Sequence, residues 1–439
     1  MFILFAILAA VSITKLAVSQ IDRQTKDDLY SQIELFSYAL TTIQAEYAEE
    51  PAPKDLIYGS LQGMLSSLDP HSQFLTPDDY KELKTETQGK FGGLGIEISV
   101  RDGLLTVITP IEDTPAWKAG IMAGDRIVKI EDELTRDLSL SDAVKKLRGK
   151  PGTDIHITVL REDEFKIQDF TITREIIHIQ DVKNVQILED KIGYIRLTEF
   201  REDSFKEFDK ALKKLKADGA EGLIIDLRNN PGGLLNVAIN ITEEFLPAGE
   251  IIVTTKGRRP SQETVAKSSN TDPTFTSWPM AVLINQGSAS GSEIFAGAIK
   301  DNKRGVIIGE KSFGKGSVQS VIPLPDGSGI RLTTSKYFTP SGVSIHGVGI
   351  EPDIVVKRIT PVTEKDEDEQ NNIDKIFEKI ESKAPDGEDS QEAKMSPAEL
   401  EARKRLLEDN QVQAALSVLK GIKVYQKFQN SISATPNQS

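Results

Sequence analysis

The sequence predicts a multi-domain α+β protein, and three observations lead to that prediction. The chain has 439 residues, enough for two or three domains that each bury a core. The residue pattern changes along the chain. An apolar stripe with helical spacing comes first, then short predicted strands separated by glycines, and then alternating predicted strands and helices. A charged stretch follows and leads into a final helical segment. We therefore expect a helical N-terminal region, a small β-barrel with two helices, an α/β core and a helical C-terminal extension.

The composition excludes several classes of protein. With 38% hydrophobic and 27% charged residues it is ordinary for a soluble globular chain. The net charge of −14 and the lack of a long basic run argue against a nucleic-acid partner. The absence of cysteine excludes a thiol nucleophile, disulfides and cysteine zinc sites. The four histidines do not fall at metal-ligand spacing, so we expect neither a metal nor a cofactor; they are His71, His156, His178 and His346.

The start of the chain predicts export. Phe2–Ile13 is an apolar run that is too short to span a membrane comfortably, and the small residues Ala17–Ser19 suit signal cleavage. The usual positive n-region is missing, and a buried first helix is the alternative interpretation. We assign residues 1–19 to a signal peptide or membrane anchor, which leaves both cleavage and membrane association through the N-terminus open.

Residues 20–86 form the predicted N-terminal helical region. An apolar stripe at spacings of three and four predicts an amphipathic helix; it consists of Leu29, Ile33, Phe36, Leu40, Ile43 and Tyr47. Such a stripe usually packs in a core, but a narrow seam also fits a dimer contact. Pro51–Pro53 ends this helix, and a second helix is expected from Asp55 to Leu68.

Residues 87–172 have the pattern of a small β-domain. Gly92–Ile98 is a glycine-rich turn entering a strand, Leu104–Ile108 and Ile155–Arg161 are strands, and Leu140–Leu147 is a helix. The order resembles a PDZ domain. A glycine-rich hairpin without a ligand is the alternative.

The PDZ resemblance implies a peptide-binding site. In that family a loop holds a peptide's terminal carboxylate with consecutive backbone N–H groups, and the adjoining strand and helix hold the peptide as an added strand. The loop here is made by Gly93, Leu94, Gly95 and Ile96, and the helix offers Val144 and Leu147 to the groove. Arg148 resembles an arginine that couples the PDZ domain to the active site in some relatives; a solvated arginine at the helix end is an equal alternative.

Residues 173–358 predict an α/β core. Lys191–Leu197 and Gly222–Arg228 read as strands with a helix between them, and the tight turn Asn229–Gly233 follows. A strand (281–285), a helix (290–300), a strand (306–309) and a hairpin (318–339) come next.

Beyond the core the chain becomes charged and then helical. Residues 359–395 have the composition of a linker. Ser396–Glu399 is a capping box with proline at the first helical position, and it starts the C-terminal helical region, 396–439. Apolar residues there are expected to dock on the body or on another subunit; they are Leu416, Leu419, Ile422 and Phe428.

One group of residues carries the chemistry. Ser290 follows the apolar run Met280–Ile284, where a buried strand turns into a helix whose N-terminal N–H groups can hold an oxyanion. Lys315 comes 25 residues later and Gln319 four residues after that. A serine hydroxyl needs a base, and a lysine can act as one when desolvation lowers its pKa. We expect Phe313, Val318 and the small glycines around the lysine to provide that desolvation, and Gln319 to orient the lysine without adding charge.

This set resembles the Ser/Lys/Gln arrangement of the C-terminal processing peptidases, also called tail-specific serine proteases, which carry an inserted PDZ domain. The turn Asn229–Gly233, the runs Tyr337–Gly342 and Gly349–Asp353, and Leu68–Ser72 ahead of the PDZ domain match as well. The resemblance spans residues 30–355 and includes the domain order. It implies a core of the crotonase/ClpP-like type.

The resemblance also assigns roles. Ser290 is the expected nucleophile, Lys315 the general base and Gln319 the orienting group. The oxyanion hole is expected from the N–H of Gly291, where alanine is common, together with Gly232 or Gly233. Ser288 and Ser292 are rivals for the nucleophile, and Glu293 is expected to serve the first turn of the helix.

The predicted function is a serine endopeptidase that grips protein C-termini with its PDZ domain and cleaves exported proteins through an acyl-enzyme. The family's usual setting is the periplasm. The expected partners are peptides with free C-termini, a further copy of the chain, and an adaptor protein as a candidate. The alternatives are a PDZ scaffold with an inactive or adaptor-gated core, a crotonase-like acyl transferase, and a protease that uses His346 with Asp226 or Asp353.

Overall fold

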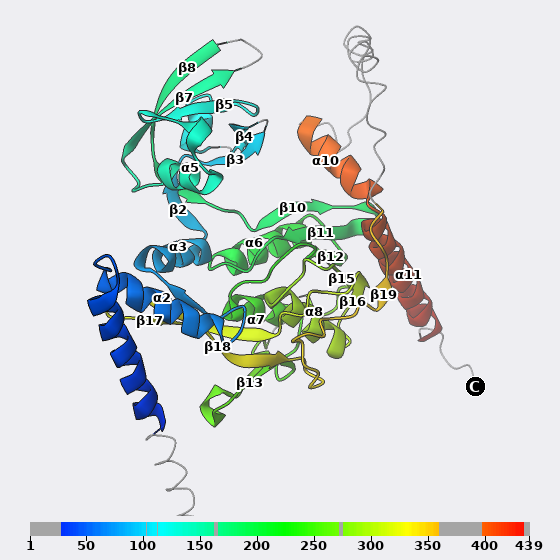
Figure 1. Ribbon diagram of the computed structural model, residues 1–439. Coiled ribbons are helices and arrows are strands. Elements are labelled where there is room, and N and C mark those ends of the chain that lie inside the picture. The colour runs from blue at the N-terminus through cyan, green and yellow to red at the C-terminus, as the bar shows by residue number, and fades with distance from the viewer. Residues whose placement is uncertain are drawn as a thin grey trace, which may run out of the picture. The chain divides into compact units, whose positions relative to one another are not determined.

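The computed structural model describes residues 28–101, 103–111, 113–161, 166–271, 275–359 and 397–433. The chain forms two compact units (Figure 1). One contains the chain up to Tyr80 together with Gln319–Thr333, and the other contains Lys81–Val318 and the chain from Thr334 onward. The predicted signal segment 1–19 and the predicted linker beyond residue 359 lie outside the described residues.

The first unit is built from helices and a short strand pair. A helix covers residues 28–46, α2 (Pro53–Ser66) follows with proline at its first position, and β1 (Gln73–Leu75) pairs antiparallel with the start of β18 (Gly329–Phe338). Phe74 is buried, with its ring centroid 4.7 Å from that of Tyr58. The unit also contains most of β17 (Ser317–Pro323), which pairs with β18.

The apolar stripe of the first helix does not pack in a core. Its members Leu29, Ile33, Phe36, Ile43 and Tyr47 are between 40% and 62% exposed. The expectation of core packing is therefore wrong within this chain, because the described residues supply no apolar surface opposite the stripe. The dimer interpretation of the stripe stays a prediction.

The predicted small β-domain, residues 87–172, is an antiparallel sheet around its own core. The strand order is β3-β4-β5-β7-β8, with bounds Ile96–Arg101, Leu104–Pro110, Arg126–Ile130, Asp154–Arg161 and Lys166–Thr173, and β6 (Glu133–Leu134) pairs with β5. The helices are α4 (Pro115–Lys118) and α5 (Leu140–Leu147), the latter capped by Ser139. Val107, Ile127, Ile155 and Val159 are fully buried between them. Short strands β2 (Lys90–Gly93) and β9 (Glu175–His178) pair at the base, and α3 (Pro77–Gln88) precedes them.

The α/β core is built on a six-stranded sheet in the order β10-β11-β12-β15-β16-β19. The bounds are Val182–Ile187, Ile192–Leu197, Gly222–Asp226, Met280–Ile284, Val306–Gly309 and Ile354–Val355. All neighbours are parallel except β10, which runs antiparallel to β11. Every residue of β12 and β15 is buried, as expected for parallel strands that are covered on both faces.

Helices α6 (Ser204–Ala217), α7 (Leu235–Glu243) and α8 (Gly291–Asp301) pack over one face of this sheet. Phe245 joins the three helices, because its ring meets those of Phe208 and Phe295 edge to face at 6.2 and 5.9 Å. A further pair, β13 (Ile251–Gly257) with β14 (Thr264–Lys267), continues into the end of β18, where Thr255 lies opposite Tyr337.

The C-terminal helices pack on the opposite face of the core sheet (Figure 1). Helix α10 (Pro397–Glu408) begins at the predicted proline, and α11 (Asn410–Ser433) buries Leu416 and Leu419 against Ile224 and Leu283. The prediction of docking on the body is confirmed for these leucines, while Phe428 is 62% exposed.

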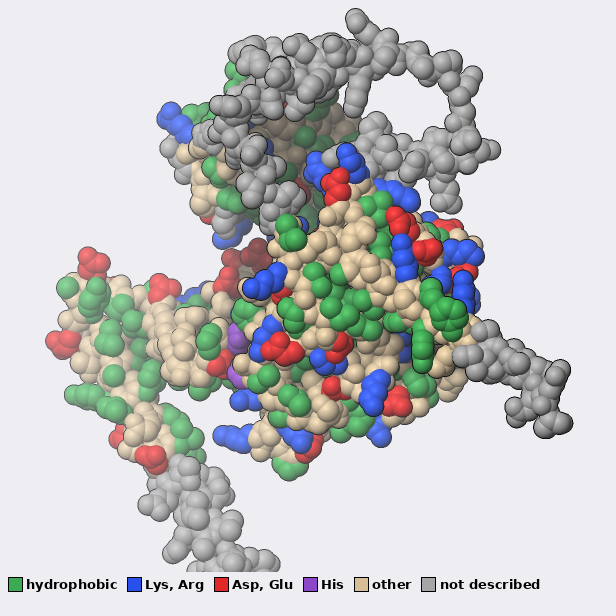
Figure 2. All heavy atoms as spheres, turned by 90° about the vertical axis from the view of Figure 1, so that its right-hand side faces the viewer, with side chains coloured by type: hydrophobic (Ala, Val, Ile, Leu, Met, Phe, Trp, Pro, Cys, Tyr) green, Lys and Arg blue, Asp and Glu red, His purple; other side chains and the backbone are tan. Residues whose placement is uncertain are grey.

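On the side that carries α11, apolar side chains alternate with charged ones (Figure 2). Among the described residues no helix is both long and apolar enough to cross a membrane.

Candidate active site

Ser290 lies at a sharp turn between a buried strand and a helix. β15 ends at Ile284, and Ser290 is the residue before α8, with φ 49° and ψ −109°. A positive φ is costly for a residue with a Cβ, and such strain is concentrated at functional sites. The side chain is only 7% exposed. Gly291 opens the helix, and its backbone N–H donates to no carbonyl of the described residues, so it is available to an oxyanion.

The glycine turn lies directly against this serine. A Cβ on Gly232 would come within 2.6 Å of the Gly291 nitrogen and 2.7 Å of the Ser290 Cβ, so only glycine fits. The Gly232 N–H donates to the Asn230 side chain at 2.9 Å. The Gly233 N–H makes no hydrogen bond to a described residue. Of the two candidate oxyanion donors, Gly233 is therefore the one whose N–H is not already engaged.

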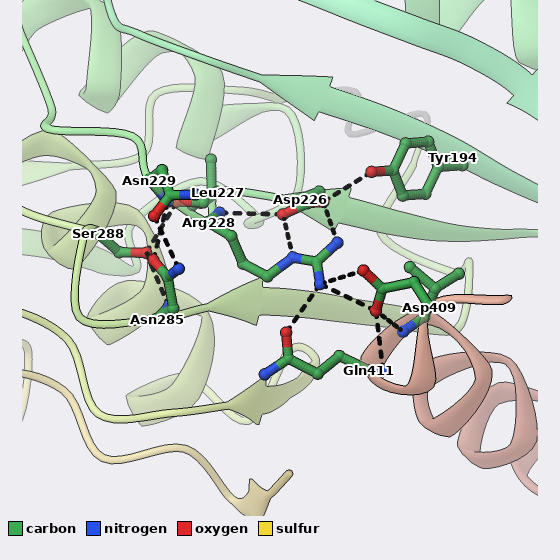
Figure 3. A network of polar contacts seen from close by, with 10 residues as sticks. Tyr194, Asp226, Leu227, Arg228, Asn229, Asn285, Ser288, Asp409 and Gln411 are labelled. Atoms are coloured by element: carbon green, nitrogen blue, oxygen red, sulfur yellow. Dashed lines mark hydrogen bonds and ion pairs between the residues drawn. The ribbon is translucent and has the colours of Figure 1, made fainter. Parts of the chain in front are cut away.

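The rival serines are held by main-chain carbonyls. Ser288 Oγ donates to the Leu227 carbonyl at 2.8 Å (Figure 3), and Ser292 Oγ donates to the Asn230 carbonyl at 2.9 Å. Both side chains are fully buried. These two hydrogen bonds have a structural role: the Ser288 hydroxyl holds the residue that follows β12, and the Ser292 hydroxyl holds the glycine turn.

Glu293 joins the serine to the lysine segment. Its fully buried carboxylate accepts hydrogen bonds from the backbone N–H of Ser290 at 2.8 Å and of Lys315 at 2.9 Å. It also accepts from the Gly314 N–H and the Ser312 hydroxyl, both at 2.6 Å. Burial raises the pKa of this carboxyl, and the four hydrogen bonds oppose that rise. The expectation that Glu293 serves only the helix turn was incomplete, since spacing cannot reveal a partner 22 residues away.

The lysine segment is less enclosed than the sequence suggested. Phe313 is 66% exposed, so its ring does not lie in the core, and desolvation of Lys315 by this ring stays a prediction. The ring points outward because the Phe313 N–H is held by the Ser288 carbonyl at 3.0 Å while Gly314 turns inward to Glu293. Lys315 is half-buried, and Val318 packs at the edge of the core.

Tyr337 is a site residue that the sequence did not single out. Its side chain is 4% exposed, and its phenol interacts with the Ser290 side chain. Burial raises the pKa of Tyr337 to about 12, and the interaction with Ser290 acts in the opposite direction, so the phenol stays protonated at neutral pH. Its backbone N–H donates to the Gly316 carbonyl at 2.8 Å, which places it beside the lysine segment. The only signal in the sequence was its membership of the run Tyr337–Gly342.

Gln319 belongs to the first unit, where the Leu68–Ser72 motif supports it. Its amide nitrogen reaches Thr333 Oγ1 at 3.5 Å, and that hydroxyl donates to Asp69 at 3.2 Å. Asp69 also accepts from the backbone N–H groups of His71 and Ser72. Burial acts to raise the pKa of Asp69, but the hydrogen bonds together lower it, so it is a stable anion.

The predicted peptide-binding loop leaves its donors unused. Leu94 and Gly95 accept hydrogen bonds through their carbonyls, from Ala116 and Ile111, but their N–H groups donate to no described residue. Among the described strands, β3, which follows the loop, pairs only with β4, so its other edge is open there. Gly93 and Leu147 are buried, while Ile96 and Val144 are half-buried.

Arg148 does not extend freely into solvent. Its guanidinium lies 4.5 Å from the centroid of the Phe91 ring and 3.5 Å from the Glu82 carboxylate. Coupling of this residue to the active site stays a prediction.

A histidine-based site is not assembled in the described residues. His346 is exposed. Asp226 is engaged by Arg228 and Tyr194, and Asp353 by Lys300 and the Ile307 N–H. Neither carboxylate is paired with the imidazole.

Comparisons with known proteins agree with this architecture. Residues 191–356 match the model of peptidase family S41, and residues 106–161 match that of the PDZ domain. The chain is 42% identical over 364 residues to a carboxy-terminal-processing protease of Bartonella bacilliformis, covering 82% of this chain and 83% of that one. It is 35% identical over 345 residues to the carboxy-terminal processing protease CtpB of Bacillus subtilis, covering 78% and 70%. Among solved structures, a photosystem II D1 C-terminal processing protease is 30% identical with a TM-score of 0.45, covering 73% of this chain and 86% of that chain.

The fold and these matches define a serine-type peptidase with a PDZ domain. The chain belongs to peptidase family S41, among the carboxyl-terminal processing proteases.

Proposed function

We propose that this protein is an endopeptidase that cleaves protein chains by a Ser/Lys mechanism. Ser290 is the nucleophile, Lys315 takes its proton and later returns it to the leaving amine, and Gln319 orients the lysine. The N–H groups of Gly291 and Gly233 stabilise the oxyanion of the tetrahedral intermediate. The observation that carries the proposal is the strained, buried Ser290 turn, whose backbone shares one carboxylate with that of Lys315.

The PDZ region is proposed to select substrates by their free C-termini. The unused N–H groups of Leu94 and Gly95 suit a terminal carboxylate, and the open edge of β3 suits an added peptide strand. Binding of an amidated peptide compared with the free acid tests this, because only the free acid carries the charge that the loop would hold. Equal affinity for the two peptides would count against it.

We further propose export to the periplasm and assembly into a homo-oligomer. The apolar start of the sequence motivates the first proposal, and the exposed stripe of the N-terminal helix motivates the second. The stripe is expected to pair with that of another copy, since a helix this apolar on one face is stabilised by burial. Sedimentation of the wild type against Ile33→Glu and Phe36→Glu would separate a dimer from a monomer.

The mechanism is tested by cleavage of casein, a loosely folded substrate. Wild type should cleave, while Ser290→Ala and Lys315→Ala should lose activity by about 10³-fold or more and Gln319→Ala by less. Ser292→Ala is the matched control, because it removes a hydroxyl two residues away that is held by a carbonyl. Cleavage by Ser290→Ala at the wild-type rate would refute the assignment.

A further inference from the structure

A buried charged cluster links the C-terminal helices to the strand that leads into the glycine turn (Figure 3). Arg228, only 6% exposed, contacts the fully buried Asp226 at 2.6 Å and Asp409 at 2.8 Å. Gln411 also accepts from the guanidinium at 2.7 Å. The Tyr194 hydroxyl donates to Asp226 at 2.6 Å. Arg228 therefore has three side-chain partners in this cluster, two of them, Asp409 and Gln411, from the C-terminal region, while Tyr194 binds Asp226.

The arginine is one residue away from the turn that borders the nucleophile. Asn229 follows it, and the Asn230 carbonyl accepts from the Ala289 N–H at 3.0 Å and from the Ser292 hydroxyl at 2.9 Å. The Asn230 side chain fixes the Gly232 N–H at 2.9 Å. A displacement of Arg228 would thus be passed to both sides of the Ser290 turn.

Asp409 has two functions at the same place. Besides Arg228, its carboxylate accepts from the backbone N–H groups of Gln411 and Val412, so it caps the start of α11. Gln411 is anchored on its other side by donating to the Val356 carbonyl at 2.7 Å. The start of α11 is therefore held rigidly against Arg228, and it supplies the second carboxylate that this buried guanidinium needs.

From this geometry we propose that Asp409 and Gln411 are positioning residues for the peptidase. They fix Arg228, and through it the Asn229–Gly233 turn that supplies the oxyanion donor and packs on Ser290. The C-terminal helices are thus part of the catalytic unit rather than an appendage. The link to catalysis rests on the proposed function. The structural part, that Asp409 and Gln411 fix the Asn229–Gly233 turn through Arg228, does not depend on it.

Asp409→Asn is the variant that tests the proposal. Asparagine keeps the helix cap and the shape but removes the charge that faces Arg228. Its matched control is Lys420→Gln/Lys423→Gln, which breaks the contacts of α11 with Glu189 and Glu221, farther along the same helix. Both variants loosen α11, and only the first loosens Arg228.

Two readouts are measured on the full-length chain. In hydrogen exchange, peptides covering residues 227–233 should exchange at least about fivefold faster in Asp409→Asn and at the wild-type rate in the control. In casein cleavage, kcat should fall about tenfold in Asp409→Asn, with KM within about twofold and the melting temperature close to that of the control. A purely structural role would lower activity in both variants in proportion to their melting temperatures.

The two readouts distinguish a failure of the Asp409 proposal from a failure of the proposed Ser/Lys mechanism. Wild-type exchange at the turn in Asp409→Asn would overturn the proposal, whatever the activity. Faster exchange at the turn with unchanged kcat would overturn its catalytic part. A wild type that does not cleave, like Ser290→Ala, would count against the proposed function, while the exchange experiment would still decide whether Asp409 positions the turn.

Discussion

The two halves of the proposed active site differ in how completely the fold encloses them. On the nucleophile side, Ser290 is 7% exposed and Ser288, Ser292 and Glu293 are fully buried, each with named hydrogen-bond partners. On the base side, Lys315 is half-buried, the neighbouring Phe313 is 66% exposed, and Gln319 belongs to the other compact unit.

This difference in burial matches the different requirements of the nucleophile and of the base. The nucleophile and oxyanion donors must be held to a fraction of an ångström, and close packing with buried hydrogen bonds achieves that. A lysine base needs desolvation, and Phe313, one of the residues expected to supply it, is largely exposed. We therefore expect the nucleophile side to be preorganised and the base side to depend more on what covers it. The predictions below test this contrast, in order of decreasing expected effect.

The largest effect is expected from Gly232→Ala, which crowds the nucleophile side. The new methyl group would come within 2.6 to 2.7 Å of the Gly291 nitrogen, the Ala289 carbonyl oxygen and the Ser290 Cβ, and casein cleavage should fall by at least about 100-fold. Gly249→Ala is the control, because it has a similar φ, 96° against 99°, with nothing within 4 Å. If the two variants cleave equally well, the nucleophile side is not rigid.

Glu293→Gln should weaken the link between the two halves. One carboxylate oxygen becomes an NH₂ group that faces backbone or hydroxyl donors, so at least one of them loses its acceptor. We expect kcat for casein to fall by roughly tenfold to 100-fold. Glu351→Gln, which changes an exposed carboxylate paired with Lys311, should leave kcat unchanged. Unchanged kcat in both would mean that the shared carboxylate is not needed.

Thr333→Val tests the support of Gln319. It removes the hydroxyl that connects the Gln319 amide to Asp69 while nearly preserving the side-chain shape. A drop in kcat of roughly fivefold is expected, smaller than for Glu293→Gln because Gln319 orients the base without reacting. Thr264→Val, in the exposed β14, is the matched control. If kcat fell more in Thr333→Val than in Glu293→Gln, the support of Gln319 would matter more than the carboxylate that links Ser290 to Lys315, contrary to the prediction.

Ser288→Ala and Ser292→Ala should affect stability more than activity. Each deletes a buried hydroxyl that donates to a carbonyl, which costs on the order of 1 kcal/mol of unfolding free energy. Cleavage by the folded variants should stay within about threefold of wild type. Loss of all cleavage in either one, with the fold retained, would transfer the nucleophile role to that serine.

The smallest effect concerns the pH dependence of stability. Burial raises the pKa of Glu293 in the folded protein, so the folded state holds this proton more tightly than the unfolded chain. As the pH rises from about 4.5 through the folded pKa, ionisation of Glu293 should lower the stability of wild type relative to Glu293→Gln. Denaturant unfolding of the two proteins across this pH range measures the change. A difference that grows in the opposite direction would mean that the hydrogen bonds outweigh burial.

The sequence was sufficient for local features and insufficient for long-range ones. Helix periodicity, the proline at the start of α10 and the strand, turn and helix around Ser290 follow from neighbouring residues. The approach of Tyr337 to Ser290 and the outward ring of Phe313 depend on how distant segments pack. The Arg228–Asp409 pair joins residues 181 positions apart, and nothing in the local pattern of either residue marks it. The periodicity of the N-terminal helix predicted its apolar stripe, but periodicity does not identify the surface that covers such a stripe.

The most direct test of the central claim is to locate the acyl-enzyme. Full-length protein would be mixed with a peptide ester, quenched in acid within the first turnover and digested, and the acylated residue would be identified by mass spectrometry. The mechanism predicts an adduct on Ser290 that is absent in Ser290→Ala and forms at least about 10³-fold more slowly in Lys315→Ala. An adduct on Ser288 or Ser292, or one that persists in Ser290→Ala, would contradict it.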